Sequence, residues 1–218
     1  MDSSQLAMGL ETDGAKYSPA VWHLVRHFYY GAEADRDYAE SFRWLNKLVS
    51  ADECPPRAFL LLGECYYNGY GTDVDYVAGV RTLLRAMEYS GLDKWGISDY
   101  EPLRCEHSWW KTVRGVLCPS DIRRIRFLLG ECFYYGNGVA KDYCKAFKYL
   151  VLSVQEEEYL YPNKDAEFLI GESYYFHRGT KQNIPMAIYW FTLASEHGNT
   201  EASAFLHKRF MASVKPKY

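Results

Sequence analysis

Cysteine and histidine are the side chains here that could bind a metal or act in catalysis, but their spacing suits neither role. The six cysteines include no Cys-x-x-Cys pair. Cys105 and His107 are followed at a distance by Cys118, whereas a structural zinc site needs four ligands at recurrent spacings. The motifs Gly-x-Ser-x-Gly, His-Glu-x-x-His and Gly-x4-Gly-Lys-Ser/Thr do not occur. We therefore predict no catalytic residue, no bound metal and no cofactor.

Charge and composition narrow the classes of partner. The 218 residues hold 25 Lys and Arg against 28 Asp and Glu, a net charge of −3, which disfavours nucleic acid and anionic membranes. The chain lacks the run of about 20 apolar residues that a transmembrane helix needs. Its first residues include Asp2, Glu11 and Asp13 rather than a basic leader. We expect a cytoplasmic protein with reduced cysteines and no membrane contact.

A short aromatic phrase recurs along the chain and indicates internal repeats. It reads LGECYY at 62–67, LGECFY at 129–134 and IGESYY at 170–175, with a fainter copy, LVRHFY, at 24–29. Setting Val25, Gly63, Gly130 and Gly171 equivalent gives intervals of 38, 67 and 41 residues. A second phrase has the same three unequal intervals and begins at Asp37, Asp75, Asp142 and Asn183. Two phrases with one set of intervals define repeating units.

Each unit is predicted to be a helix hairpin. The first helix carries the glycine and, on the same face, an aromatic residue three positions later. Glycine inside a helix costs about 1 kcal/mol relative to alanine, so we expect it to allow a close approach of the second helix. We expect the first helix to end at glycines such as Gly69, Gly136 and Gly179. The second helix should be N-capped by Asp37, Asp75, Asp142 and Asn183.

The combined pattern, Ala-x4-Gly-x2-Tyr-x2-Gly-x-Gly followed by Asp-x3-Ala, resembles the Sel-one-like repeat (SLR) family, a relative of the tetratricopeptide repeats. The resemblance extends over about residues 18–210. It implies an all-α fold, a right-handed α-solenoid of antiparallel helix hairpins. In a single domain, 1–218, we predict units at about 18–54, 55–90, 121–160 and 163–198, with an insert at 91–120 and a C-terminal capping helix at 201–212.

The insert lengthens the second interval and is rich in tryptophan. It contains Trp95, Trp109 and Trp110, which could form a secondary binding surface. One interpretation is an extra helix or ordered loop packed on the edge of the solenoid. The other is a partner-binding elaboration, because insertions in repeat proteins map to loops that often bind. The sequence leaves both open.

Three positions on each first helix form a stripe away from the predicted core. Counted from the glycine they are −3, +1 and +4, which lie on one helical face. The stripe residues are Trp22, Leu60, Phe127 and Phe168 at −3, then Glu64, Glu131 and Glu172 at +1, and Tyr29, Tyr67, Tyr134 and Tyr175 at +4. In the SLR family the matching positions line a concave groove. Tyrosine suits interface hot spots, and glutamate favours basic partners. The alternative is that these side chains pack against, or pair with, the adjacent repeat.

The resemblance implies a non-catalytic protein–protein interaction module. We expect an adaptor, scaffold or regulator that holds a partner protein or extended peptide in the aromatic and acidic groove. A structural subunit that docks through the tryptophan-rich insert is the main alternative. An enzyme with a pocket at Cys105, Glu106 and His107 is another, but nothing positions a base against a nucleophile there. The sequence does not determine the partner or the oligomeric state.

Overall fold

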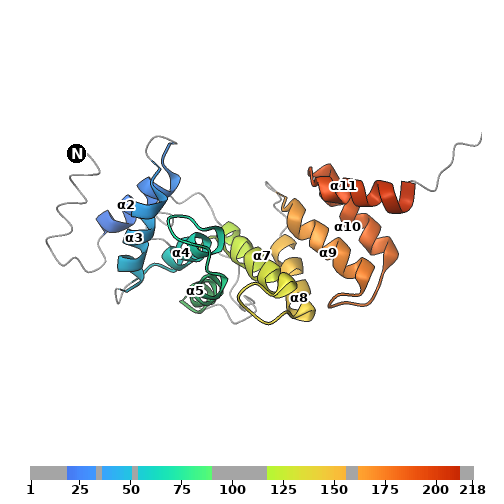
Figure 1. The fold of residues 1–218 in the computed structure, drawn as a ribbon, viewed down its shortest axis with the longest axis horizontal. Helices are drawn as coiled ribbons and strands as arrows, with labels where there is room; N and C mark the ends of the chain where they lie inside the picture. Colours follow the sequence, from blue (N-terminus) through green and yellow to red (C-terminus); the bar gives the residue numbers. More distant parts are fainter. Residues whose placement is uncertain (1–18, 33–35, 51–53, 90–116, 156–161, 212–218) are drawn as a thin grey trace, which may run out of the picture. The chain divides into compact units, whose positions relative to one another are not determined.

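The computed structural model describes residues 19–32, 36–50, 54–89, 117–155 and 162–211 (Figure 1). Within these ranges the regular elements are all helical, as predicted. They are α2 (Pro19–Tyr30), α3 (Tyr38–Val49), α4 (Pro56–Asn68), α5 (Tyr76–Tyr89), α7 (Pro119–Tyr135), α8 (Tyr143–Val154), α9 (Lys164–Phe176), α10 (Ile184–Glu196), α11 (Thr200–Leu206) and the π-helix η1 (His207–Met211). None of these helices is long and apolar enough to cross a membrane.

The chain divides into two compact units, residues 1–125 and 126–218, and each is described by itself. In the first, α2 packs on α3 and α4 packs on α5; in the second, α9 packs on α10 and α10 on α11. Most of the predicted insert, including Trp95, Trp109 and Trp110, lies outside the described residues. The handedness of the solenoid and the role of the insert stay predictions.

One recurrent turn starts the second helix of every hairpin. The four predicted caps each accept a hydrogen bond from the backbone N–H three residues later, over 2.9 to 3.1 Å. The backbone N–H of each cap donates to the carbonyl of the aromatic residue three positions after the first-helix glycine or its Val25 equivalent, over 2.9 to 3.0 Å. These residues are Asp37 with Phe28, Asp75 with Tyr66, Asp142 with Phe133, and Asn183 with Tyr174. The predicted caps are therefore confirmed.

The glycine inside each first helix is the point where the hairpin closes. A Cβ added to Gly171 would lie 2.8 Å from the Phe191 ring of α10. Gly63 and Gly130 are equally close to Leu83 and Leu150. Because real Cβ atoms do not approach other atoms this closely, a larger residue would push the two helices apart. The predicted close approach is confirmed.

The end of α9 differs from the expectation. The helix ends at Phe176, and His177 rather than Gly179 provides the left-handed cap, with φ 59°. The backbone N–H of His177 closes the last turn on the Ser173 carbonyl. Gly179 follows with φ 75°, and a Cβ there would overlap the Tyr143 carbonyl at the start of α8. The loop after one first helix therefore packs against the second helix of the preceding hairpin.

The helix α11 closes the C-terminal end of the second unit. Ala202 and Leu206 of α11 pack on Phe191 and Ala194 of α10. The helix begins at Thr200, with the Asn199 side chain accepting from the Ala202 N–H. The chain then continues as the π-helix η1 instead of as one regular helix. This arrangement places the N-terminus of α11 beside α9.

Candidate functional site

The residues predicted to line a groove divide into two groups by burial. Five are buried inside the chain: Trp22, Tyr29, Leu60, Phe127 and Tyr134. Six are half-buried: Glu64, Tyr67, Glu131, Phe168, Glu172 and Tyr175. Because a buried side chain offers no contact area to a partner, only the second group can contribute to a binding surface.

The buried tyrosines join successive repeats. The Tyr29 hydroxyl of α2 donates to Glu64 Oε2 of α4 over 2.8 Å, and the Tyr134 hydroxyl of α7 donates to Glu172 Oε2 of α9 over 2.7 Å. In both cases position +4 of one unit meets position +1 of the next. The Arg178 guanidinium adds a 2.7 Å bond to the Tyr134 oxygen. For these two pairs, the alternative of pairing with the adjacent repeat is the observed arrangement.

The surroundings of these phenols keep them protonated. Burial raises the pKa of Tyr29 far above its usual value, and the negative charge of Glu64 raises it further. Burial and the hydrogen bond to Glu172 likewise raise the pKa of Tyr134, although Arg178 acts in the opposite direction. A neutral phenol remains a hydrogen-bond donor over the whole physiological range of pH. The tyrosine–glutamate links are therefore structural.

The exposed aromatic side chain is one residue further along, at position +5. Tyr30, Tyr135 and Phe176 are 51%, 50% and 41% exposed, and each ends its first helix. Each ring packs edge-on against the preceding aromatic ring, with centroids 4.8 to 5.1 Å apart. Sequence reasoning missed this position. Its signal was present, because three of the units have three consecutive aromatic residues there.

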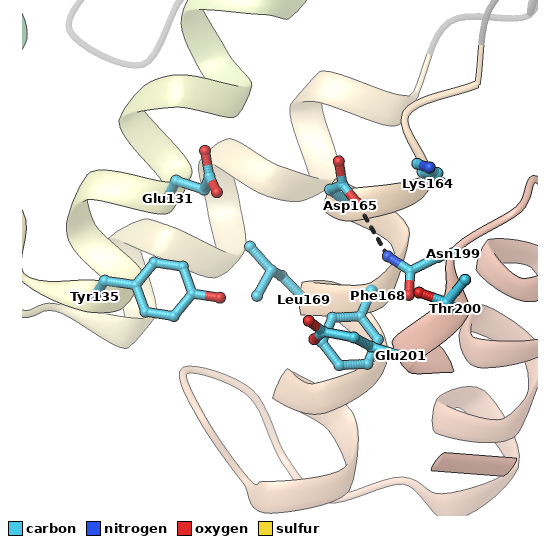
Figure 2. A pocket seen from close by; sticks show the side chains of 9 residues that line it. All are labelled: Glu131, Tyr135, Lys164, Asp165, Phe168, Leu169, Asn199, Thr200 and Glu201. Carbon is cyan, nitrogen blue, oxygen red and sulfur yellow. Dashed lines mark hydrogen bonds between the residues drawn. The ribbon is translucent and has the colours of Figure 1, made fainter. Parts of the chain in front are cut away.

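A pocket of about 250 Å³ lies in the unit 126–218, on the side where first helices are neighbours (Figure 2). It is formed by α7 and α9, the first helices of two successive repeats, and by the start of the C-terminal helix α11. Two residues predicted from the sequence, Glu131 and Phe168, line it. The other lining residues are Tyr135, Lys164, Asp165, Leu169, Asn199, Thr200 and Glu201. Figure 2 shows the Tyr135 ring directed toward Leu169 and Glu201.

Three acidic side chains and two aromatic rings, those of Tyr135 and Phe168, line the pocket. Glu131, Asp165 and Glu201 contribute three carboxylates against one cation, Lys164, whose Nζ donates to the Gly198 carbonyl over 3.2 Å. The pKa of the Tyr135 phenol is raised to about 12, mainly by burial and then by Glu172, Glu131 and Glu201. Such a site favours a cation with an apolar stem.

Part-buried side-chain contacts tie α9 to the turn between α10 and α11. Asn199 Nδ2 donates to Asp165 Oδ1 over 3.0 Å, which ties the start of α11 to α9. Two residues further along α9, the fully buried Glu167 places Oε2 2.7 Å from His197 Nδ1, while its Oε1 has no hydrogen-bond partner among the described residues. Burial raises the pKa of Glu167, and His197 partly offsets the effect. The turn between α10 and α11 is thus fixed by side chains of α9.

The cysteines of the described residues are thiols. Cys54, Cys65 and Cys132 are buried, and Cys144 is exposed on α8. Burial raises the pKa of each buried thiol to about 12. Within the ranges that the structure covers, no group of three His, Cys, Asp or Glu side chains could hold a metal ion. Cys105, Glu106 and His107 lie outside those ranges.

Helix hairpins of this kind, packed one after another, define a helical-repeat protein. The sequence profile described as Sel1 repeat matches residues 26–52, 57–81, 126–154 and 164–199, more than half of the chain. The chain belongs to the Sel1 repeat family. Proteins of this family are generally non-catalytic modules for protein–protein interaction. A comparison with curated proteins finds no match.

Solved structures show the same fold. One is c5321 of uropathogenic Escherichia coli, described as a protective antigen with an SLR fold; it is 19% identical with a TM-score of 0.59 over 96% of this chain. This chain spans only 37% of the length of c5321. Another is a Sel1 repeat protein from Oxalobacter formigenes, 18% identical with a TM-score of 0.59, which covers 98% of this chain and 72% of its own. Both likenesses concern the fold alone.

Proposed function

We propose that this protein is an adaptor, scaffold or regulator that binds a basic, extended segment of a partner protein against the helices α7, α9 and α11. The observation that supports the proposal is the acidic pocket between these helices, bordered by the half-exposed Tyr135. Sel1 repeats generally mediate protein interactions. In this protein we propose that the binding surface lies on α7, α9 and α11 and that the bound segment carries Lys or Arg.

The shape of the surface suits a protein segment. Tyr135 ends α7 with half of its side chain exposed, and Phe176 ends α9 in the same manner. Aromatic side chains that are partly exposed and held by packing are typical of interface hot spots. Extended peptides suit the face of a helical-repeat protein because successive units repeat the same contacts. The half-buried groove residues of α7 and α9, which are Glu131, Phe168, Glu172 and Tyr175, belong to this proposed surface.

The charge of the surface sets the partner's chemistry. Glu131, Asp165 and Glu201 face one pocket, so a partner with Lys or Arg is favoured and nucleic acid is disfavoured. Charge complementarity of this kind acts mainly on specificity and on the association rate, and it weakens as salt is added. We place the interaction in the cytoplasm, in keeping with the reduced cysteines.

The experiment is an affinity capture with a charge-neutralised variant. Glu131→Gln, Asp165→Asn and Glu201→Gln are combined, because amides keep the shape and remove the charge. A matched variant neutralises three exposed acids elsewhere: Asp73→Asn, Glu88→Gln and Glu196→Gln. Both must show the helical circular dichroism of the wild type. Captured proteins are identified by mass spectrometry.

We expect a protein that is retained by the wild type and the matched variant and lost by the pocket variant. A protein retained by all three would contradict the pocket. That result would favour docking elsewhere, including the alternative of a structural subunit that assembles through residues 91–120. Loss from both variants would show that overall charge, and not this site, carries the interaction.

A further inference from the structure

In the unit 1–125, an arginine of the chain binds the glutamate at position +1 of a first helix. Arg124 Nε of α7 donates to Glu64 Oε1 of α4 over 2.8 Å. Glu64 is one residue after the key glycine of its unit, and Arg124 is six residues before the key glycine of the next unit. Glu64 thereby receives the Tyr29 hydroxyl on one oxygen and an arginine on the other.

The next two intervals have acids at the position that Arg124 occupies. Glu131 at +1 is followed by Asp165 at −6. Glu172 at +1 is followed by Glu201, six residues before His207, which takes the place of the glycine 36 residues after Gly171. The register is the same, but a pair of opposite charges has become a pair of like charges. The first interval has arginines at both of these register positions, Arg26 at +1 and Arg57 at −6, and Asp121 lies 3.4 Å from the Arg57 guanidinium.

The pocket lies at this altered position. Its wall contains Glu131 and Asp165, the equivalents of Glu64 and Arg124, together with Glu201. In the unit 1–125 Arg124 binds Glu64 at the equivalent position, whereas in the unit 126–218 a cavity of about 250 Å³ lies there. We infer that this cavity binds an arginine side chain of the partner, at the register position where the preceding interval has Arg124 and this interval has Asp165. The inference rests on the proposed function and specifies its ligand.

Arginine fits this site better than lysine for two reasons. A guanidinium group is a planar fork with five N–H donors, so one side chain can bond to more than one carboxylate, whereas an ammonium group is a compact and strongly hydrated charge. A guanidinium also stacks on aromatic rings, and Phe168 and Tyr135 line the cavity. Arg124 also binds Glu64 through its Nε–H, a donor that lysine does not have.

The test uses two small probes and no partner. N-acetyl-arginine N-methylamide and the corresponding lysine compound are titrated into the full-length 15N-labelled protein, and amide shifts are followed by NMR. We expect saturable shifts at residues 131, 165 and 199–201 with the arginine probe. The lysine probe should bind at least fivefold more weakly. Equal affinity for both probes, or shifts spread over acidic residues along the whole chain, would overturn the inference.

The variant Asp165→Arg places an arginine of the chain at position −6, which Arg124 occupies in the preceding interval. This arginine should occupy the site that the probe would bind. This variant should lose the binding of the arginine probe by tenfold or more. Asp73→Arg, with the same change of charge at an exposed loop residue, should retain it. Glu201→Gln, which leaves the Asn199–Asp165 bond intact, provides a second variant and should weaken the probe severalfold.

The result is separable from the outcome of the capture experiment. If a partner depends on the pocket carboxylates but the two probes bind equally, the proposed function stands and the preference for arginine fails. If the arginine probe binds and no captured protein depends on the carboxylates, the cavity is an arginine site and the proposed function fails. Continued binding of the probe to Asp165→Arg would contradict the equivalence with Arg124.

Discussion

The Tyr134 hydroxyl donates to Glu172 Oε2 over 2.7 Å and so connects the first helices of two successive repeats. The same bond joins Tyr29 to Glu64 in the other compact unit. A motif found twice in a register defined by sequence spacing is a property of the repeat. Part of the recurrent aromatic phrase therefore serves the stacking of repeats.

Tyr134→Phe should reduce the free energy of unfolding by about 1 to 2 kcal/mol, because a buried hydrogen bond to a carboxylate is lost while the ring remains. Urea denaturation followed by circular dichroism measures the change. Tyr135→Phe is the control, since that ring is half exposed and its hydroxyl borders the pocket. Equal stability of Tyr134→Phe and the wild type would show that the link adds nothing to the stacking.

Gly171→Ala should destabilise the second unit by about 1 to 3 kcal/mol, because the new Cβ would overlap the Phe191 ring of α10. Gly79→Ala is the matched control. It lies inside α5, and its added Cβ would meet other atoms at an ordinary 3.4 Å or more. There alanine should gain up to about 1 kcal/mol from helix propensity. Thermal unfolding compares the two, and a tolerated Gly171→Ala would contradict the close approach.

Glu167→Gln should become more stable relative to the wild type as the pH rises from 4 to 7. The folded pKa of Glu167 is raised above its ordinary value of 4.5 by burial. Its stabilising contribution is therefore complete below that value and is lost as the pH rises through the folded pKa. Glutamine does not titrate and avoids the loss. The melting temperatures of both proteins at each pH measure the difference, and a difference that does not grow with pH would refute it.

Cys144 should react with iodoacetamide much faster than Cys65 or Cys132 in the folded protein at pH 8. The thiols of Cys65 and Cys132 each have a pKa of about 12, so only about one molecule in ten thousand carries either as a thiolate at pH 8. Both side chains are also buried. Peptide mapping by mass spectrometry measures the rates. In 8 M urea the cysteines should react alike. Fast labelling of Cys65 or Cys132 without urea would mean that α4 or α7 is not packed as described.

The sequence predicts the hairpin well because its determinants are local. The caps Asp37 and Asp142 act within four residues, and the glycine that lets α9 approach α10 is read from its spacing to the aromatic residue that follows it. Helical-wheel arithmetic relates a side chain to its own hairpin. It therefore could not predict that Tyr134 is buried and that its hydroxyl bonds to Glu172 of the next repeat.

Helical-wheel positions do not predict the contacts between successive repeats. Whether Tyr134 meets solvent or Glu172 depends on how successive hairpins stack, and the two residues are 38 apart in the chain. The pocket has the same origin, because it brings Glu131 of α7 to Asp165 of α9 and to Glu201 of α11. Glu131 could be predicted from the glutamate stripe, while Asp165, Glu201 and the exposed ring of Tyr135 could be assigned to the site only from the packing.

Site-specific photocrosslinking tests directly whether a partner protein binds at the pocket that Tyr135 borders. A benzophenone amino acid replaces Tyr135 in one protein and, as the control, Tyr189 on α10 in another; Tyr189 is 56% exposed and does not line the pocket. After irradiation with the native partners, adducts are mapped to the peptide by mass spectrometry. We predict an adduct between position 135 and a partner peptide that contains arginine, and no such adduct when Asp165→Arg is added. An adduct at position 189 alone, or one at 135 that persists with Asp165→Arg, would contradict it.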